Sequence, residues 1–366
     1  MAHMNQSVID YTPKTYAGCA GKVCKIDCSL GVNMEPLPER VTERLKNISE
    51  DSLKHYPHSE EVFDSLLAKL RAQNPTLKRG NLSLGAGSID LLISLNTLFL
   101  NEKKTLLGYA PQFSAYVDDV HFRGTRYIGV PLKKDENYKI DVNEMCRAIK
   151  ENKPDVVYVD NPNNPTGQIL SKQQIFEIHA AADAVDAALI VDEAYGEYMP
   201  KADSMVSEVN KLNGLIVVKT LSKGYGMAGM RLGYALAAPE IISQFDKLAI
   251  PFNCNGFARE LAVSMLRDGD YLQDLLQVTE RKSKKLKETL SGKIKIANTA
   301  DSTCISLLYT DDASIDLAET LADVGILSVS GASFDNLSVN SVRLMVPAEK
   351  DMDLLCTLLR EAERHM

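Results

Sequence analysis

One short stretch of the sequence carries both a potentially reactive amine and groups suited to binding a phosphate. Lys223 follows two hydroxyl residues, Thr220 and Ser222, and Arg231 stands eight positions after it. A lysine that forms a Schiff base needs a structured, desolvated place. A phosphate is bound by hydroxyls, backbone N–H groups and the guanidinium fork of an arginine. An aldehyde that carries a phosphate would satisfy both needs, and the stretch therefore predicts pyridoxal 5'-phosphate (PLP) as the cofactor.

The same stretch has other interpretations. A Lys-Thr-Leu-Ser-Lys run alone is most often a surface turn. Residues 224–229 match the G-x-G-x-x-G fingerprint of dinucleotide-binding folds, which should open a helix after a strand. A strand is expected before it, over 215–219, but residues 232–237 read as another strand, which disfavours that interpretation. Lys219 is the rival Schiff-base lysine, but Met227 stands eight positions after it and offers no charge to a phosphate.

Polar residues also follow other apolar runs of this chain. Asp192, Asn164 and Lys223 each come after a short run expected to form a strand, over 187–191, 155–159 and 215–218 respectively. A strand-end aspartate is often only a helix cap, and an Asn-Pro-rich stretch is usually only a turn. In open parallel sheets, however, ligands bind beyond the carboxyl ends of the strands. The three residues in this order therefore indicate one site.

The elements that would position these residues alternate through the middle of the chain. Strands are expected over 105–108, 125–130, 155–159, 187–191, 215–219 and 233–237. Helices are expected over 60–71, 89–100, 143–152 and 172–185, and a glycine-rich turn over 81–88. Short apolar strands separated by helices predict an α/β fold with a mostly parallel sheet flanked by helices.

The pattern changes in the last third of the chain. A long charged helix is expected over 258–290, followed by strands over 304–309 and 341–346 and by helices over 316–324 and 350–365. These elements predict a smaller α+β domain. We expect an N-terminal segment, 1–40, that packs with the small domain, a large PLP-binding domain, 41–260, and the small C-terminal domain, 261–366.

Several motifs resemble those of fold-type-I PLP-dependent aminotransferases of class I and II, and the resemblance covers nearly the whole chain. They are Asn-Pro-Asn-Asn-Pro-Thr-Gly at 161–167 and Ser-Lys-x(7)-Arg at 222–231. Pro-Phe-Asn-Cys-Asn at 251–255 and His-Tyr-Pro at 55–57 resemble the branch of histidinol-phosphate aminotransferases and threonine-phosphate decarboxylases. The resemblance implies an aspartate-aminotransferase-like large domain.

The resemblance also implies roles for individual residues. Lys223 matches the lysine that forms the Schiff base and then moves the proton. Asp192 matches the partner of the pyridine nitrogen, where a carboxylate keeps the ring protonated so that it accepts electrons from the substrate Cα. Asn164 and Tyr195 match the donors to the ring 3'-oxygen, and Phe113 matches the aromatic residue that stacks on the ring.

Further cofactor contacts follow from the same resemblance. The phosphate would be held by Gly87, Ser88, Ile89, Thr220, Ser222 and Arg231. The first three stand at an expected helix N-terminus, where N–H groups and the helix dipole favour an anion. Tyr56 matches a tyrosine that reaches the phosphate from the neighbouring subunit, so the resemblance implies a homodimer with shared active sites.

The substrate residues agree only in part with that branch. Arg343 matches an arginine that grips the substrate α-carboxylate with two hydrogen bonds, and Gly31 and Asn164 are expected beside it. Ser328 stands where the branch carries a second arginine for a phosphate, and Gly31-Val-Asn33 departs from its usual Asn-x-Asn. We therefore expect transamination of an unphosphorylated α-amino acid, with amino-acid and keto-acid substrates.

Three alternatives stay open at this point. A PLP-dependent decarboxylase or lyase would share every cofactor residue, because the reaction depends on which Cα bond lies perpendicular to the ring. Histidinol-phosphate transamination is the second. A non-catalytic PLP-binding regulator is the third, and the intact lysine and the lack of a recognisable DNA-binding domain disfavour it.

Composition excludes other classes of protein. The net charge of −8 argues against nucleic acid or an anionic membrane as the partner. No window has 18 uncharged apolar residues, so no transmembrane helix is expected. The seven cysteines lack paired C-x-x-C spacing, so we expect no metal site. Free thiols in a reducing cytoplasm are the expectation.

Overall fold

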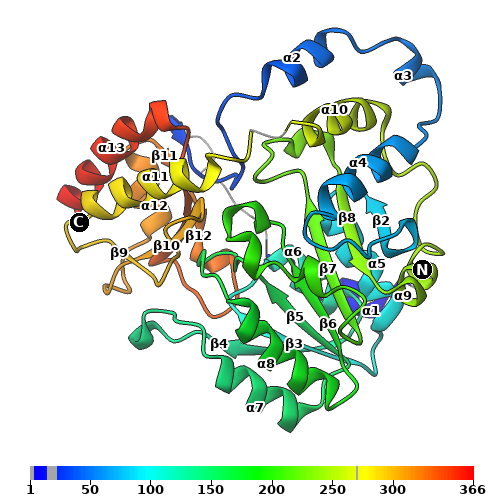
Figure 1. Ribbon diagram of the computed structural model, residues 1–366. Helices are drawn as coiled ribbons and strands as arrows, with labels where there is room; N and C mark the ends of the chain where they lie inside the picture. The colour runs from blue at the N-terminus through cyan, green and yellow to red at the C-terminus, as the bar shows by residue number, and fades with distance from the viewer. Residues whose placement is uncertain (1–3, 15–22, 269–270) are drawn as a thin grey trace.

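A mostly parallel sheet forms the centre of the large domain (Figure 1). The computed structural model describes residues 4–14, 23–268 and 271–366. Among these, seven strands pair in the order β2-β8-β7-β6-β5-β3-β4, and β8 runs antiparallel to both of its neighbours. They are β2 (Leu82–Gly85), β3 (Thr105–Ala110), β4 (Arg126–Pro131), β5 (Val156–Asp160), β6 (Ala188–Asp192), β7 (Leu215–Thr220) and β8 (Gly233–Ala237). The predicted α/β sheet is confirmed.

Helices cover both faces of this sheet and bury alternate strand residues. Val157 and Val159 face a core shared with α4 (Glu60–Leu70), α7 (Val142–Asn152) and α8 (Lys172–Asp183). Val156 and Tyr158 face the opposite core, formed with α5 (Ser88–Phe99), α6 (Ser114–Phe122) and α9 (Pro239–Phe245). Side chains alternate between the faces of a strand. A strand buried on both faces therefore reads as a continuous apolar run, which is why these strands were predictable.

Two local expectations differ from the structure. Residues 81–88 were expected as a turn, but 82–85 form β2, because they pair with β8 through backbone hydrogen bonds that a local sequence pattern does not reveal. The helix α6 was not expected. Its apolar side chains alternate with polar ones that are themselves buried, including Asp118 and Ser114, so its periodicity is weak.

The small domain is built on an antiparallel sheet. Among the described residues its strands pair in the order β12-β13-β10-β9. They are β9 (Lys295–Ile296), β10 (Ile305–Tyr309), β12 (Val329–Ser330) and β13 (Ser341–Met345). The helices α11 (Leu275–Thr289), α12 (Leu317–Asp323) and α13 (Met352–His365) pack on it around a separate apolar core (Figure 1).

The single helix expected over 258–290 is wrong. The structure has two helices, α10 (Gly256–Leu266) and α11, and between them the Asp268 carboxylate accepts the Tyr271 N–H at 2.9 Å. The two helices also have different partners, since α10 packs against α2 (Glu39–Lys46) and α4, whereas α11 packs against α13. The predicted division of the chain stays a proposal, and this packing favours a boundary between residues 266 and 275.

The N-terminal segment contacts both domains. The strand β1 (Ile26–Asp27) pairs in parallel with β11 (Ile326–Leu327) of the small domain. The helix α1 (Gln6–Asp10) lies against α6 instead, and the Tyr11 hydroxyl donates to Asp118 at 2.7 Å. A short helix, α3 (Asp51–Lys54), follows α2. No helix in the described part of the chain is long and apolar enough to cross a membrane.

Candidate active site

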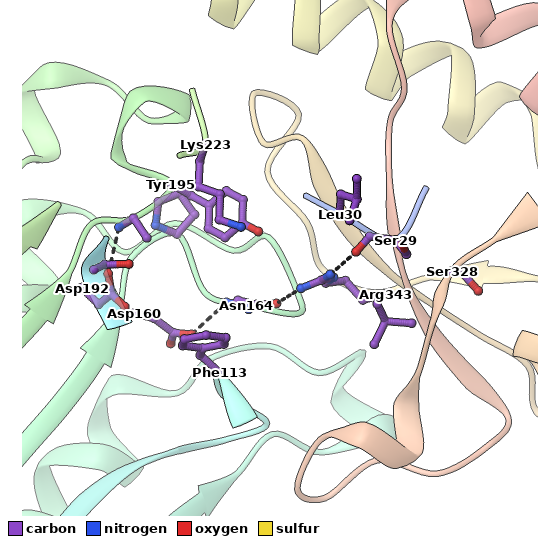
Figure 2. A pocket seen from close by; sticks show the side chains of 14 residues that line it. Ser29, Leu30, Phe113, Asp160, Asn164, Asp192, Tyr195, Lys223, Ser328 and Arg343 are labelled. Carbon is purple, nitrogen blue, oxygen red and sulfur yellow. Dashed lines mark hydrogen bonds between the residues drawn. The ribbon is translucent and has the colours of Figure 1, made fainter. Parts of the chain in front are cut away.

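A cavity of about 380 Å³ lies where the carboxyl ends of the parallel strands face the small domain (Figure 2). The large domain contributes the ends of β5 and β6 and the loop after β7, and the small domain contributes β12 and β13. Ser29 and Leu30 of the N-terminal segment complete the wall. The predicted residues that line it are Ser88, Phe113, Asn164, Asp192, Tyr195, Lys223 and Arg343.

Lys223 reaches into this cavity, with its Nζ atom 5.2 Å from the centre of the Tyr195 ring. Burial, together with the positive charge of Arg343, lowers the pKa of Lys223 to about 8. An amine with such a pKa is partly unprotonated near neutral pH and can act as a nucleophile or a base. Lys223 thus has the environment that a Schiff-base lysine requires.

Lys219 has the opposite environment. Its Nζ atom lies 3.1 Å from Glu193 and 3.4 Å from Glu197, in a buried cluster outside the cavity lining. The two carboxylates outweigh burial and raise the pKa of Lys219 above its usual value. The protonated amine is not nucleophilic, which argues against the rival lysine.

Asp192 lies at the end of β6. Its carboxylate accepts hydrogen bonds from the Tyr158 hydroxyl and from the Ala194 N–H, both at 2.9 Å. Burial nevertheless raises the pKa of Asp192 to about 6. Its charge is therefore costly until a cation approaches, and a protonated pyridine nitrogen is such a cation.

Arg343 and Asn164 are joined across the cavity. An Arg343 Nη1 atom donates to the Asn164 side-chain oxygen at 3.2 Å, and Nη2 donates to the Ser29 carbonyl (Figure 2). Arg343 is buried on β13, beside β12. The guanidinium group is thus held by an uncharged amide and a carbonyl while it lines the same cavity as Lys223.

Gly31 shapes the site through its backbone. It has a φ of +60°, and a Cβ atom there would lie 2.3 Å from the Tyr195 hydroxyl oxygen. A larger residue would displace Tyr195 or the N-terminal segment. Gly31, which the sequence places beside the substrate, therefore lies against Tyr195, although Gly31 itself does not line the cavity.

The predicted phosphate residues meet at the N-terminus of α5. Arg231 donates to the Ala86 carbonyl at 3.2 Å and to the Ser222 hydroxyl at 3.4 Å, and Thr220 donates to the Ser222 hydroxyl at 2.9 Å. Gly87 has a φ of +85°, and a Cβ atom there would lie 2.5 Å from an Arg231 nitrogen. Ser88 and Ile89 form the first turn of the helix, whose N–H groups lack partners within the helix. Hydroxyls, N–H groups and an arginine fit a phosphate dianion.

Tyr56 does not join the site of its own chain. Its side chain is 73% exposed and stacks on Phe252, with ring centres 4.4 Å apart. It does not line the cavity. If it reaches a phosphate, it does so in another subunit.

Asp160 and Ser29 of the cavity lining, and Tyr158, which contacts Asp192 from outside the lining, were not predicted from the sequence. Asp160 ends β5 directly before the Asn-Pro motif, and its place at a strand end was a usable signal. Tyr158, which holds Asp192, had no such signal, because it reads as one more strand residue. Ser29 acts through its carbonyl, which every residue type supplies.

The chain matches known proteins over most of its length. The family model of aminotransferase class I and II matches residues 25–360. The histidinol-phosphate aminotransferase of Caldanaerobacter subterraneus is 29% identical over 329 residues, 89% of either chain. That of Clostridium novyi is 31% identical over 269 residues, 73% of this chain and 72% of the relative.

Solved structures show the same fold. The histidinol-phosphate aminotransferase of Sinorhizobium meliloti in complex with pyridoxal-5'-phosphate has a TM-score of 0.83 at 20% identity and covers 100% of this chain and 98% of its own. The aspartate aminotransferase of Thermus thermophilus with maleate has a TM-score of 0.82 at 20% identity, over 99% of this chain and 100% of its own. The chain therefore belongs to the class I and II aminotransferases, and it is a PLP-dependent enzyme of fold type I.

Proposed function

We propose that this aminotransferase acts on an unphosphorylated α-amino acid whose carboxylate binds Arg343. The observation that carries the proposal is the placement of Arg343, a buried arginine held by Asn164 and Ser29 in the cavity that Lys223 enters. A guanidinium fork recognises a planar carboxylate with two hydrogen bonds. A substrate held there would present its amino group and Cα to the Lys223 side of the cavity.

The residues of this chain would divide the chemistry among them. When bound, PLP supplies an aldehyde that takes up the amino group and a ring that accepts electrons from Cα. Lys223, with a pKa of about 8, would remove the proton from the substrate Cα. It would then deliver the proton to the carbon that the cofactor aldehyde contributes. Asp192 would hold a proton on the ring nitrogen, and Asn164 and Tyr195 would bind the 3'-oxygen. Phe113 would cover one face of the ring.

The lining of the cavity supports an unphosphorylated substrate. Among the described lining residues, the cations are Lys223 and Arg343. Ser328 is buried there, and its hydroxyl has no hydrogen-bond partner among the described residues. A phosphate carries close to two negative charges, and burying it beside a single arginine leaves charge uncompensated.

The name shared by the relatives favours a second candidate, a histidinol phosphate substrate. Such a substrate has no α-carboxylate, so Arg343 would then bind the phosphate. A panel of donors separates the two candidates. We expect unphosphorylated amino acids to convert the bound cofactor to its pyridoxamine form faster than histidinol phosphate or threonine phosphate does, as measured by stopped-flow absorbance. A clear preference for histidinol phosphate would assign Arg343 to its phosphate, and a clear preference for either phosphorylated donor would contradict the proposal.

We also propose that the chain forms a homodimer in which Tyr56 serves the partner's site. Tyr56 and Phe252 form an exposed stacked pair, and Leu53 and Ile250, close to them in sequence, are exposed as well. Exposed apolar side chains that gather on one face mark interaction surfaces.

The free cysteines, including the buried Cys28 and Cys304, support a cytoplasmic location.

A further inference from the structure

Asp160 is a buried carboxylate in the active-site cavity that the reaction described above does not use. It ends β5, and its Cα atom pairs with that of Asp192 at the end of β6. Both side chains are 4% exposed, and both line the cavity (Figure 2). Two carboxylates therefore stand side by side on the floor of the site.

In the part of the chain that the structure describes, the donors that hold Asp160 are uncharged. Its Oδ1 atom accepts from the Asn163 amide at 2.9 Å and from the Gln112 amide at 3.4 Å, and its Oδ2 atom accepts from the Asn164 N–H at 2.9 Å. Asp192 is likewise held by a hydroxyl and an N–H. Hydrogen bonds donated to a carboxylate favour its ionised form.

The charge of this pair is not balanced locally. Burial raises the pKa of Asp160 to about 7, and the Asp192 charge adds to that rise. The donors that bind the two carboxylates among the described residues are uncharged, although Lys223 favours the charge on Asp192 from a distance. Four tyrosines that interact with the pair, Tyr158, Tyr109, Tyr127 and Tyr116, stay neutral because burial raises their pKa values. The charge of Glu193 adds to the rise in the pKa of Asp192. Paired buried carboxylates are unfavourable unless a cation lies against them.

We propose that Asp160 is a second carboxylate for the cofactor ring, which acts with Asp192 to stabilise the protonated pyridine nitrogen. Asp192 makes the contact, and Asp160 strengthens the negative potential at the floor. In this role Asp160 helps to keep the proton on the pyridine nitrogen through Asp192. It is therefore a positioning residue and not a catalytic residue. The competing explanation is structural: Asp160 merely caps the loop 161–167, as its bond to the Asn164 N–H would suffice to do.

Binding of pyridoxamine 5'-phosphate to the cofactor-free protein separates the two explanations. This compound carries the ring and the phosphate but forms no Schiff base with Lys223, so its affinity reports the noncovalent contacts. At pH 8 we expect Asp160→Asn to weaken its binding about tenfold or more, the change that corresponds to one pKa unit at the ring nitrogen. Asp192→Asn should weaken it further. Asp141→Asn is the matched control, because the Asp141 carboxylate caps α7 by accepting two backbone N–H groups outside the cavity. This variant should leave the affinity unchanged.

Thermal melting supplies a second measurement. Because Asp160→Asn removes an unbalanced buried charge, the cofactor-free variant should melt at pH 8 no lower than the parent, and pyridoxamine 5'-phosphate should raise its Tm by less. A lower Tm in the cofactor-free variant with affinity within twofold of the parent would show a loop cap only. Should Asp160→Asn fail to fold, Asp160→Ser retains a capping oxygen without the charge, and the same results are expected of it.

The design also separates this proposal from the choice of substrate, because no amino donor is present. Normal binding by Asp192→Asn would place the ring elsewhere and overturn the proposal together with the role of Asp192. A result in the donor panel that contradicts the unphosphorylated substrate would leave the binding experiment unaffected.

Discussion

Lys219 and Lys223 are four residues apart in the sequence, but their side chains lie in opposite electrostatic environments. Lys223 faces the cavity, and its amine loses its proton easily. Lys219 does not line the cavity, and its amine contacts Glu193 and Glu197. The cluster also constrains glycines beside both active-site residues: a Cβ atom at Gly196 would lie 2.4 Å from the Lys219 amine, and one at Gly224 would lie 2.4 Å from the Glu197 Cβ. Lys219 is therefore a structural ion that supports the backbone next to Tyr195 and Lys223.

Replacing Lys219 should destabilise the fold. Lys219→Met leaves two buried carboxylates without their cation, and breaking a buried pair in this way costs about 3–5 kcal/mol. The loss should shrink as the pH falls, because the raised pKa of Glu197 lets that carboxyl take up a proton in the folded state. Chemical denaturation across a range of pH measures it.

The matched control is Lys282→Met. Lys282 is as deeply buried, but its partner Glu35 is 23% exposed in its side chain and can be solvated when the lysine is removed. A smaller loss is expected for Lys282→Met, and Glu193→Gln with Glu197→Gln should restore part of the stability of Lys219→Met. Equal losses for the two lysine variants would contradict the account.

Secondary-structure elements were predictable from the sequence wherever local pattern decides the outcome. The parallel strands were predictable, because burial on both faces of the sheet gives apolar runs such as Val156 to Val159. The break between α10 and α11 was not predicted, although Asp-Gly-Asp at 268–270 is a turn signal in the sequence. Nor was β2, which depends on pairing with a strand some 150 residues away.

The candidate site divides in the same way. Residues at strand ends, such as Lys223 and Asp192, were predictable because topology places the ends of parallel strands at one edge. Arg343 and the phosphate residues came from the motifs of the family. Ser29 acts through a backbone carbonyl that the N-terminal segment brings to Arg343, and a tertiary contact of this kind leaves no trace in local sequence.

At the scale of the whole molecule, the cavity lies where three parts of the chain meet. The large domain brings Lys223 and the other residues proposed to hold the cofactor, and β13 brings Arg343. The N-terminal segment pairs with β11 and carries Ser29 to the guanidinium group. A movement of the small domain would therefore move Arg343 relative to Lys223. Tyr56 is exposed and does not line this cavity, so its proposed role depends on the assembly of subunits.

Mixing two inactive variants tests whether the subunits share their sites. A dimer of one Lys223→Ala chain and one Tyr56→Ala chain would contain one site that lacks both groups and one intact site, so transaminase activity should partly recover after subunit exchange. The control mixes Lys223→Ala with Asp192→Ala, both of which line the cavity of their own chain, and leaves no intact site. No recovery in verified Lys223→Ala/Tyr56→Ala heterodimers would show that Tyr56 does not serve the partner's site.

The central claim is that Lys223 is the lysine that binds PLP, and the most direct measurement is to fix the cofactor in place. The purified protein is treated with borohydride, digested, and its peptides are mapped by mass spectrometry. The pyridoxyl group should be found on Lys223, whose lowered pKa and position in the cavity fit a Schiff base. A pyridoxyl group on Lys219, or on no lysine, would contradict the account.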